Sequence, residues 1–205
     1  MSTAEEIRQA SIGMTAPDFL RSLLAEKFPE KTAVTASLRA RSVVVLSMIA
    51  EIDPATRIIF CHAPDLYPES VEYRDDIISK LKLSNIRIAG NRPGNPSEET
   101  TSHSEDILSD VYGGDPVHST LCLDQSLAGF DCWISAVYHR PYGDEGIARV
   151  SDEQGLLRIA PLEGWSQEAV HAHLAERNLP LHPHIEIKQK RPSVAGTQSI
   201  PTYHY

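Results

Sequence analysis

The fold is decided by the stretch AVTASLRARSVVVLSMIAEIDPATRIIFC, residues 33–61. It opens with a short buried strand at Ala33–Ala36. After Ser37 the apolar residues favour a helix that stops at Asp53–Pro54, because the residue before a proline disfavours helical geometry. A second strand follows at Arg57–Cys61. A strand, a helix and a strand in this order predict two parallel strands joined by a crossover helix.

The same alternation extends on both sides of this stretch. A capping box at Thr15–Asp18 starts an earlier helix, Pro68 opens a later one with an apolar stripe that reaches Leu81, and Ile86–Ile88 supplies a third strand. The predicted fold class is therefore α/β, with three layers and a mostly parallel sheet flanked by helices.

The second half of the chain adds an edge to this sheet. A fourth strand is predicted at Asp131–Val137, and Ala148–Val150 with Leu156–Ile159 flank a turn at Asp152–Gly155, which indicates a hairpin. The last helix is capped by Ser166 and ends at Asn178, and an irregular tail follows. The polar stretch Gly90–Ser104 is predicted to be a long loop, either a lid or a segment without function.

Composition favours one domain over residues 1–205, with a core at about 30–180 and tails at 1–14 and 185–205. The formal net charge of −9 argues against nucleic acid and anionic membranes as partners. The N-terminus is acidic, unlike a signal peptide, and no apolar run approaches the roughly 18 residues of a membrane span. A cytoplasmic protein is the resulting expectation.

Cysteine and histidine spacing disfavours metal cofactors. Cys61, Cys122 and Cys132 form no Cys-x-x-Cys pair and are too few for an iron–sulfur cluster, so reduced, buried thiols are expected. Four histidines near the C-terminus suggest a metal site at first sight, but the first two are two residues apart on a helix and point to different faces. We expect these histidines to be partly exposed or satisfied in the core; they are His171, His173, His182 and His184.

Four stretches recur in the order and spacing of a known family. They are Ala50–Ser70, Gly129–Ser135, Leu156–Ser166 and Glu176–Pro183. Together they resemble adenylyl-sulfate and phosphoadenylyl-sulfate (PAPS) reductases over roughly residues 30–195. The resemblance implies the adenine nucleotide alpha-hydrolase-like (PP-loop) fold, with an adenine nucleotide or sulfonucleotide as ligand.

The chain departs from this family in its working parts. The family's Ser-x-Gly phosphate loop reads Ser37–Ser42 here, with Arg39 where glycine is expected, and its Asp-Thr-Gly motif becomes His62–Pro64. Arg140 stands one place later than the family's sulfonucleotide-binding arginines. No cysteine follows Cys132, although the reductases carry a catalytic cysteine near the C-terminus. Reduction through such a thiol is therefore not expected.

A set of polar residues remains as the candidate site. The loop between the first strand and its helix favours an anion, because a helix N-terminus presents free N–H groups and a positive dipole end. The predicted nucleotide- or anion-binding residues are Ser37, Arg39, Arg41, Ser42, Asp65 and Arg140, and the predicted acid–base residues are His62 and His139. The alternative is that the loop arginines are simply solvated.

Two functions stay open at this stage. The first is a divergent PAPS reductase-like protein that acts on a bound adenine nucleotide or sulfonucleotide by non-thiol chemistry, such as hydrolysis or transfer. The second is a catalytically silent nucleotide-binding or scaffold subunit that works with a partner protein. A homodimer is compatible with either.

Overall fold

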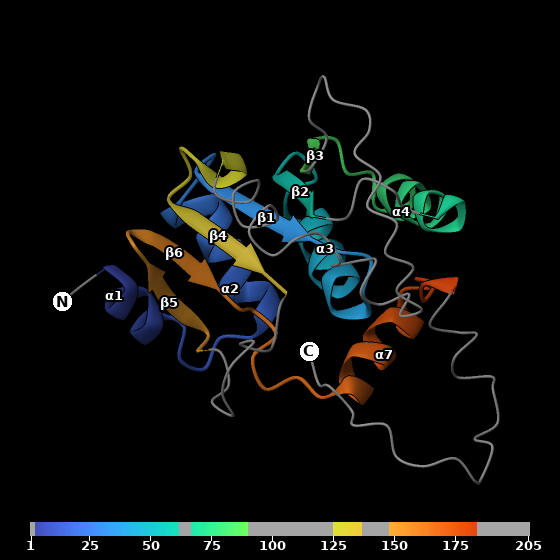
Figure 1. Cartoon of the computed structure of the whole chain (residues 1–205). Coiled ribbons are helices and arrows are strands. Elements are labelled where there is room, and N and C mark those ends of the chain that lie inside the picture. Colours follow the sequence, from blue (N-terminus) through green and yellow to red (C-terminus); the bar gives the residue numbers. More distant parts are fainter. Residues whose placement is uncertain (1–2, 62–66, 90–124, 137–147, 184–205) are drawn as a thin grey trace, which may run out of the picture.

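The computed structural model describes residues 3–61, 67–89, 125–136 and 148–183. Its centre is a six-stranded sheet in the order β3-β2-β1-β4-β6-β5 (Figure 1). The strands are β1 (Thr32–Ala36), β2 (Arg57–Cys61), β3 (Ile86–Ala89), β4 (Cys132–Ser135), β5 (Val150–Glu153) and β6 (Leu156–Ile159). All neighbours pair in parallel except β5 and β6, which form an antiparallel hairpin. The predicted mostly parallel α/β sheet is confirmed.

Helices flank the strands, and all of them except α1 lie where the sequence pattern predicted a helix. They are α1 (Thr3–Ala10), α2 (Ala16–Ser22), the π-helix η1 (Leu23–Lys27), α3 (Ala40–Ile52), α4 (Pro68–Leu81) and α7 (Gln167–Glu176). Thr15 and Ser166 cap α2 and α7, because each hydroxyl accepts a hydrogen bond from the backbone N–H three residues later. No helix within the described ranges is long and apolar enough to cross a membrane.

The two faces of the sheet carry separate apolar clusters. Val34 of β1 belongs to the large cluster, which α2, α3, α4 and α7 share. Ala33 and Ile59 point to the other face, where Leu127, from a helical turn at residues 125–127, packs on them. Alternation along each strand therefore positions the core on both sides of the sheet.

The N-terminal segment differs from its prediction as a tail. Helix α1 buries Ala4 and Ile7 in the large cluster, and Arg8 Nη2 donates a hydrogen bond to the carbonyl of Val150 on the edge strand β5 at 3.1 Å. Arg149 fixes the connection that follows, since its guanidinium donates to the carbonyl of Ser11 at 2.9 Å. Only three of its eight residues are apolar, and two of these are alanines, so the pattern was too weak to predict this helix.

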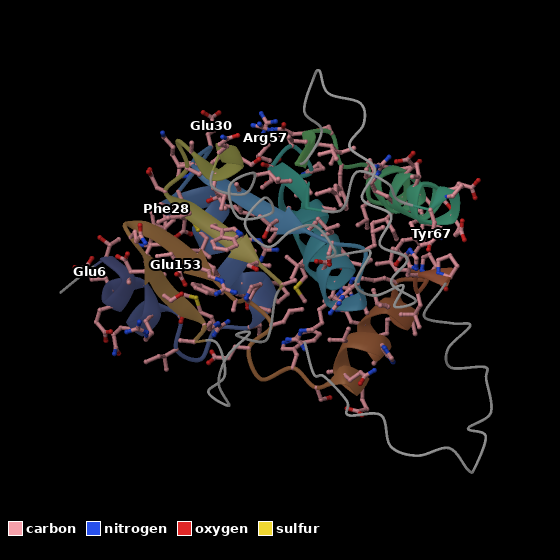
Figure 2. All side chains as sticks on the ribbon, in the orientation of Figure 1. Glu6, Phe28, Glu30, Arg57, Tyr67 and Glu153 are labelled. Atoms are coloured by element: carbon pink, nitrogen blue, oxygen red, sulfur yellow. The ribbon has the colours of Figure 1, made fainter. Side chains whose placement is uncertain are left out.

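The hairpin turn is also tighter than predicted. Strand β5 continues to Glu153, so only Gln154 and Gly155 remain in the turn, with φ of 58° and 94°. Positive φ at both positions is typical of a two-residue hairpin turn. Figure 2 shows Glu153 at this hairpin and Tyr67 at the distant start of α4. The predicted loop at 90–104 and the predicted tail at 185–205 lie outside the described residues.

Candidate functional site

The predicted anion loop lies at the carboxyl edge of the central strands. Strand β1 ends at Ala36, and α3 begins at Ala40 with Arg39 as its N-cap. On one side of β1 the chain continues through β2 to β3, and on the other side lie β4 and β6. Strand order reverses at this point, which is where open α/β sheets bind their ligands.

Hydrogen bonds within residues 37–42 fix the shape of the loop. The N–H of Ser37 donates to Ser42 Oγ at 3.0 Å, and the two hydroxyl oxygens lie 3.2 Å apart. The N–H of Arg39 donates to Ser37 Oγ at 3.4 Å. Both serines are buried, and Leu38 between them turns into the core with 2% of its surface exposed. The loop is thus pre-shaped by its own hydroxyl groups.

The first turn of α3 has the electrostatics of an anion site. Its N-cap provides no side-chain hydrogen bond, and its first turn holds no acidic residue. The first backbone N–H groups of a helix have no intrahelical acceptor, and the dipole adds positive potential there. The half-buried Arg39 adds a formal positive charge at the same end.

Arg41, one of the predicted anion-binding residues, also makes contacts within the protein that the sequence did not predict. Its Nη1 donates to the carbonyl of Trp165 at 3.0 Å, and its Nη2 donates to the carbonyl of Leu162 at 2.5 Å. These carbonyls belong to the turn that precedes α7. Arg41 therefore ties residues 162–165, which we call the α7 entry turn, to the N-terminal turn of α3.

The structure does not place the remaining predicted site residues. His62, Asp65, His139 and Arg140 lie outside the described ranges. By sequence, His62 directly follows β2, which ends at the same carboxyl edge as β1.

The described cysteines lie at opposite edges of the sheet. Cys61 is the last residue of β2, at the carboxyl edge, whereas Cys132 is the first residue of β4, at the amino edge. Cys132 is fully buried, and burial raises the pKa of its thiol to about 12. Because the thiolate is the nucleophile, Cys132 is unsuited to attack a substrate.

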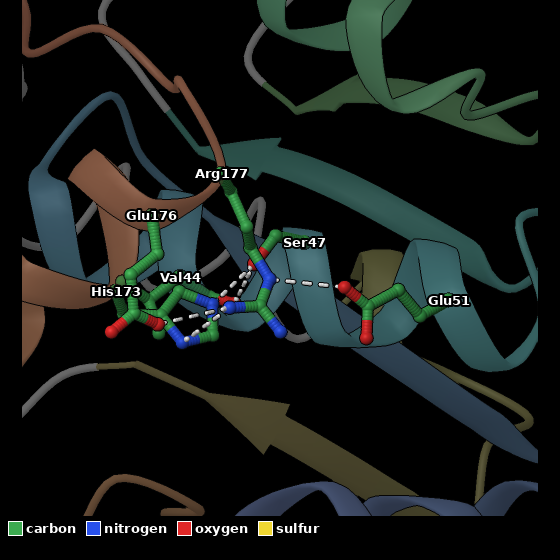
Figure 3. A network of polar contacts seen from close by, with 6 residues as sticks. All are labelled: Val44, Ser47, Glu51, His173, Glu176 and Arg177. Atoms are coloured by element: carbon green, nitrogen blue, oxygen red, sulfur yellow. Dashed lines mark hydrogen bonds and ion pairs between the residues drawn. The ribbon is translucent and has the colours of Figure 1, made fainter.

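A second polar cluster, not predicted from the sequence, joins α3 to α7 (Figure 3). Ser47 Oγ donates to the carbonyl of Val44 at 2.8 Å and lies 2.8 Å from His173 Nε2. The other ring nitrogen of His173 lies 3.4 Å from Arg177 Nη1, and Arg177 Nε pairs with Glu51 at 3.0 Å. We call these four side chains, Ser47, Glu51, His173 and Arg177, the α3–α7 cluster.

The cluster borders a surface pocket of about 470 Å³, which Lys80 also lines. Burial lowers the pKa of His173, and the positive charge of Arg177 lowers it further, against the opposing effect of Glu51 and Glu176. No short-range signal in the sequence could have found this cluster, because Ser47 and His173 are 126 residues apart.

His182 makes contacts typical of a structural residue, and His184 lies outside the described ranges. His182 is buried, with Nε2 3.0 Å from Ser70 Oγ and its ring edge-on to Tyr73 at 4.9 Å. Within the ranges that the structure describes, no group of three or more His, Cys, Asp or Glu side chains is arranged to hold a metal ion.

Comparison with known proteins points to one family. A family model described as phosphoadenosine phosphosulfate reductase domain matches residues 31–188. A phosphoadenosine 5'-phosphosulfate reductase of Gloeobacter violaceus is 19% identical over 176 residues, which cover 82% of this chain and 71% of that protein. An adenosine 5'-phosphosulfate reductase of Salinibacter ruber is 24% identical over 149 residues, or 69% of this chain and 57% of that protein.

A solved structure supports the same fold. The PAPS reductase of Candida auris, determined as a phosphate complex, has a TM-score of 0.66 and 15% identity, covering 92% of this chain and 93% of that one. At this identity the likeness establishes the fold, including its parallel strands and covering helices.

Proposed function

This chain belongs to the phosphoadenosine phosphosulfate reductase domain family, and from this premise we propose that it binds a sulfonucleotide with an anionic group at residues 37–42. The observation that carries the proposal is the pre-shaped loop at the N-terminus of α3. Its hydroxyls hold the backbone in place, and its position at the reversal of strand order is the usual ligand position in such sheets.

The two arginines of the loop divide the work in this proposal. Arg41 already donates to two backbone carbonyls of the α7 entry turn, so it serves the shape of the site. Arg39, at the N-cap, supplies the charge that meets the anion. A guanidinium on a phosphate or sulfate makes charge-assisted hydrogen bonds, which are stronger than neutral ones.

We further propose that the chain does not reduce its ligand through a C-terminal thiol. Its sequence has no cysteine after Cys132, and Cys132 is buried at the wrong edge of the sheet. Hydrolysis or transfer at the activated sulfate or phosphate would need an acid or base instead. His62 and His139 are our candidates, because each follows a central strand at its carboxyl end.

Calorimetric titration with adenylyl sulfate and PAPS tests the binding site. We expect Arg39→Ala to weaken binding by roughly 10- to 100-fold, the loss of one or two charge-assisted hydrogen bonds. Arg57→Ala is the matched control, because Arg57 begins β2 at the opposite edge of the sheet. Equal affinities for wild type and Arg39→Ala would contradict the proposed site.

Assays of sulfite release with thioredoxin and of nucleotide hydrolysis test the chemistry. We expect no sulfite from wild type. Sulfite release that disappears in Cys61→Ser would contradict the non-thiol proposal and identify the thiol at the carboxyl edge as the nucleophile. Tight binding without turnover of either kind would favour a binding subunit that depends on a partner protein.

A further inference from the structure

We infer that His173 is a positioning residue for the 37–42 site, and that ligand binding there weakens when His173 takes up a proton. The inference rests on the proposed function. His173 is remote from the anion loop and acts on it through the α7 entry turn, so the α3–α7 cluster controls the shape of the loop.

The hydrogen bonds define which ring nitrogen of His173 carries the proton. Ser47 donates its single hydroxyl hydrogen to the carbonyl of Val44. Ser47 Oγ must therefore accept a hydrogen bond from His173 Nε2–H. In a neutral imidazole the other nitrogen, Nδ1, is then an acceptor. It faces Arg177 Nη1 at 3.4 Å, so His173 accepts from α7's own arginine while it donates to α3.

A second proton on His173 would disrupt this arrangement. Nδ1–H would point at the guanidinium of Arg177, which can only donate, and two positive charges would lie side by side. Arg177 would be driven from its position, and with it the ion pair to Glu51. Glu51 and Glu176 offset part of the repulsion, while Lys80, across the pocket, adds positive charge.

The α7 entry turn connects the cluster to the anion loop. The ring of Trp165 packs edge-on against the ring of His173, with centroids 5.7 Å apart. The backbone carbonyl of the same Trp165 accepts from Arg41, which lies within the 37–42 segment. A shift of His173 therefore displaces a residue that the anion loop holds directly.

The sign of the pH effect follows from the lowered pKa of His173. The unfolded chain has a histidine pKa of about 6.5, and the folded value lies below it. The contribution of His173 to stability is therefore fully present above about pH 6.5 and is lost as pH falls through the folded pKa. Binding at the 37–42 site should weaken over the same range.

Titration with adenylyl sulfate between about pH 8 and pH 5 tests the inference. The charges of its sulfate and phosphate groups do not change over this range. We expect the affinity of wild type to fall about 5-fold or more on acidification. His173→Gln, whose amide can both donate to Ser47 and accept from Arg177, should lose that part of the pH dependence. His171→Gln, two residues away on α7, should behave as wild type.

Urea unfolding over the same pH values gives a readout that needs no ligand. We expect the acid loss of stability to be smaller in His173→Gln than in wild type and unchanged in His171→Gln. If wild type binds but the pH dependence persists in His173→Gln, the inference is wrong and the proposed function stands. If wild type binds no adenylyl sulfate at any pH, the proposed function fails and the link to the site fails with it, while the urea series still tests the cluster itself.

Discussion

The two ends of α3 are held in opposite ways. At the N-terminal end, Ser37 and Ser42 bond across five residues of the same loop. In the C-terminal half, Ser47 and Glu51 contact α7 across 126 residues of sequence. The Ser37–Ser42 contacts are local in sequence and form together with strand β1 and helix α3. The second set of contacts forms only when α7 docks, so the two ends should respond differently to substitution.

The largest effect on stability should come from Arg41, which reaches from the first end to the α7 entry turn. Arg41→Ala removes two charged hydrogen bonds to the carbonyls of Leu162 and Trp165, so we expect a loss of about 2–4 kcal/mol in the free energy of unfolding. Urea unfolding measures it. We expect a smaller loss from Arg39→Ala, because Arg39 stands at the N-cap of α3 and is only half-buried. Equal losses in the free energy of unfolding for the two variants would contradict a structural role for Arg41 that Arg39 does not share.

A smaller loss in the free energy of unfolding is expected when the hydroxyl pair of Ser37 and Ser42 is broken. Ser42→Ala leaves the buried N–H of Ser37 without its acceptor, which should cost about 1–3 kcal/mol. Ligand affinity should fall as well, because the loop backbone loses its shape. The exposed Ser79→Ala on α4 is the control for both measurements. A Ser42→Ala protein with full affinity would show that the hydroxyl pair does not shape the site.

The smallest stability effect should come from the far end of the α3–α7 cluster. Glu51 and Arg177 pair at 3.0 Å, with 56% and 32% of their side chains exposed, and such pairs contribute about 0–1 kcal/mol. Glu51→Gln should therefore barely change unfolding in urea. Its effect should appear in the pKa of His173, which falls further when the negative charge is removed. Proton NMR titration of His173 measures it, and a raised pKa would contradict this account of the cluster.

The difference between the two ends also explains what the sequence could predict. The strand β2, the start of α4 at Pro68 and the Thr15 cap follow from local patterns, and the structure confirms them. The position of the 37–42 loop at a strand-to-helix junction was likewise readable, and the roles of its residues stay predictions. The contacts of Arg41 could not be predicted from the sequence, because its acceptors lie 121 and 124 residues away.

The contacts of His173 could not be predicted from the sequence. A histidine on an amphipathic helix is compatible with solvent, core or metal, and only the partner that faces it decides among these. The N-terminal helix was not predicted for a related reason. Its few apolar side chains are buried in the same cluster as Val150 of the edge strand β5, which is distant in sequence.

Helix α1 also bears on how the protein behaves at high concentration. Strand β5 ends the sheet, and an exposed edge strand can recruit a strand from another molecule and so begin aggregation. Arg8 occupies the carbonyl of Val150 on that strand, and Ile7 packs against the cluster to which Val150 belongs. Residues 3–10 thus cover part of this edge strand, so we expect a chain that lacks α1 to self-associate more readily at high concentration while it keeps its loop at residues 37–42.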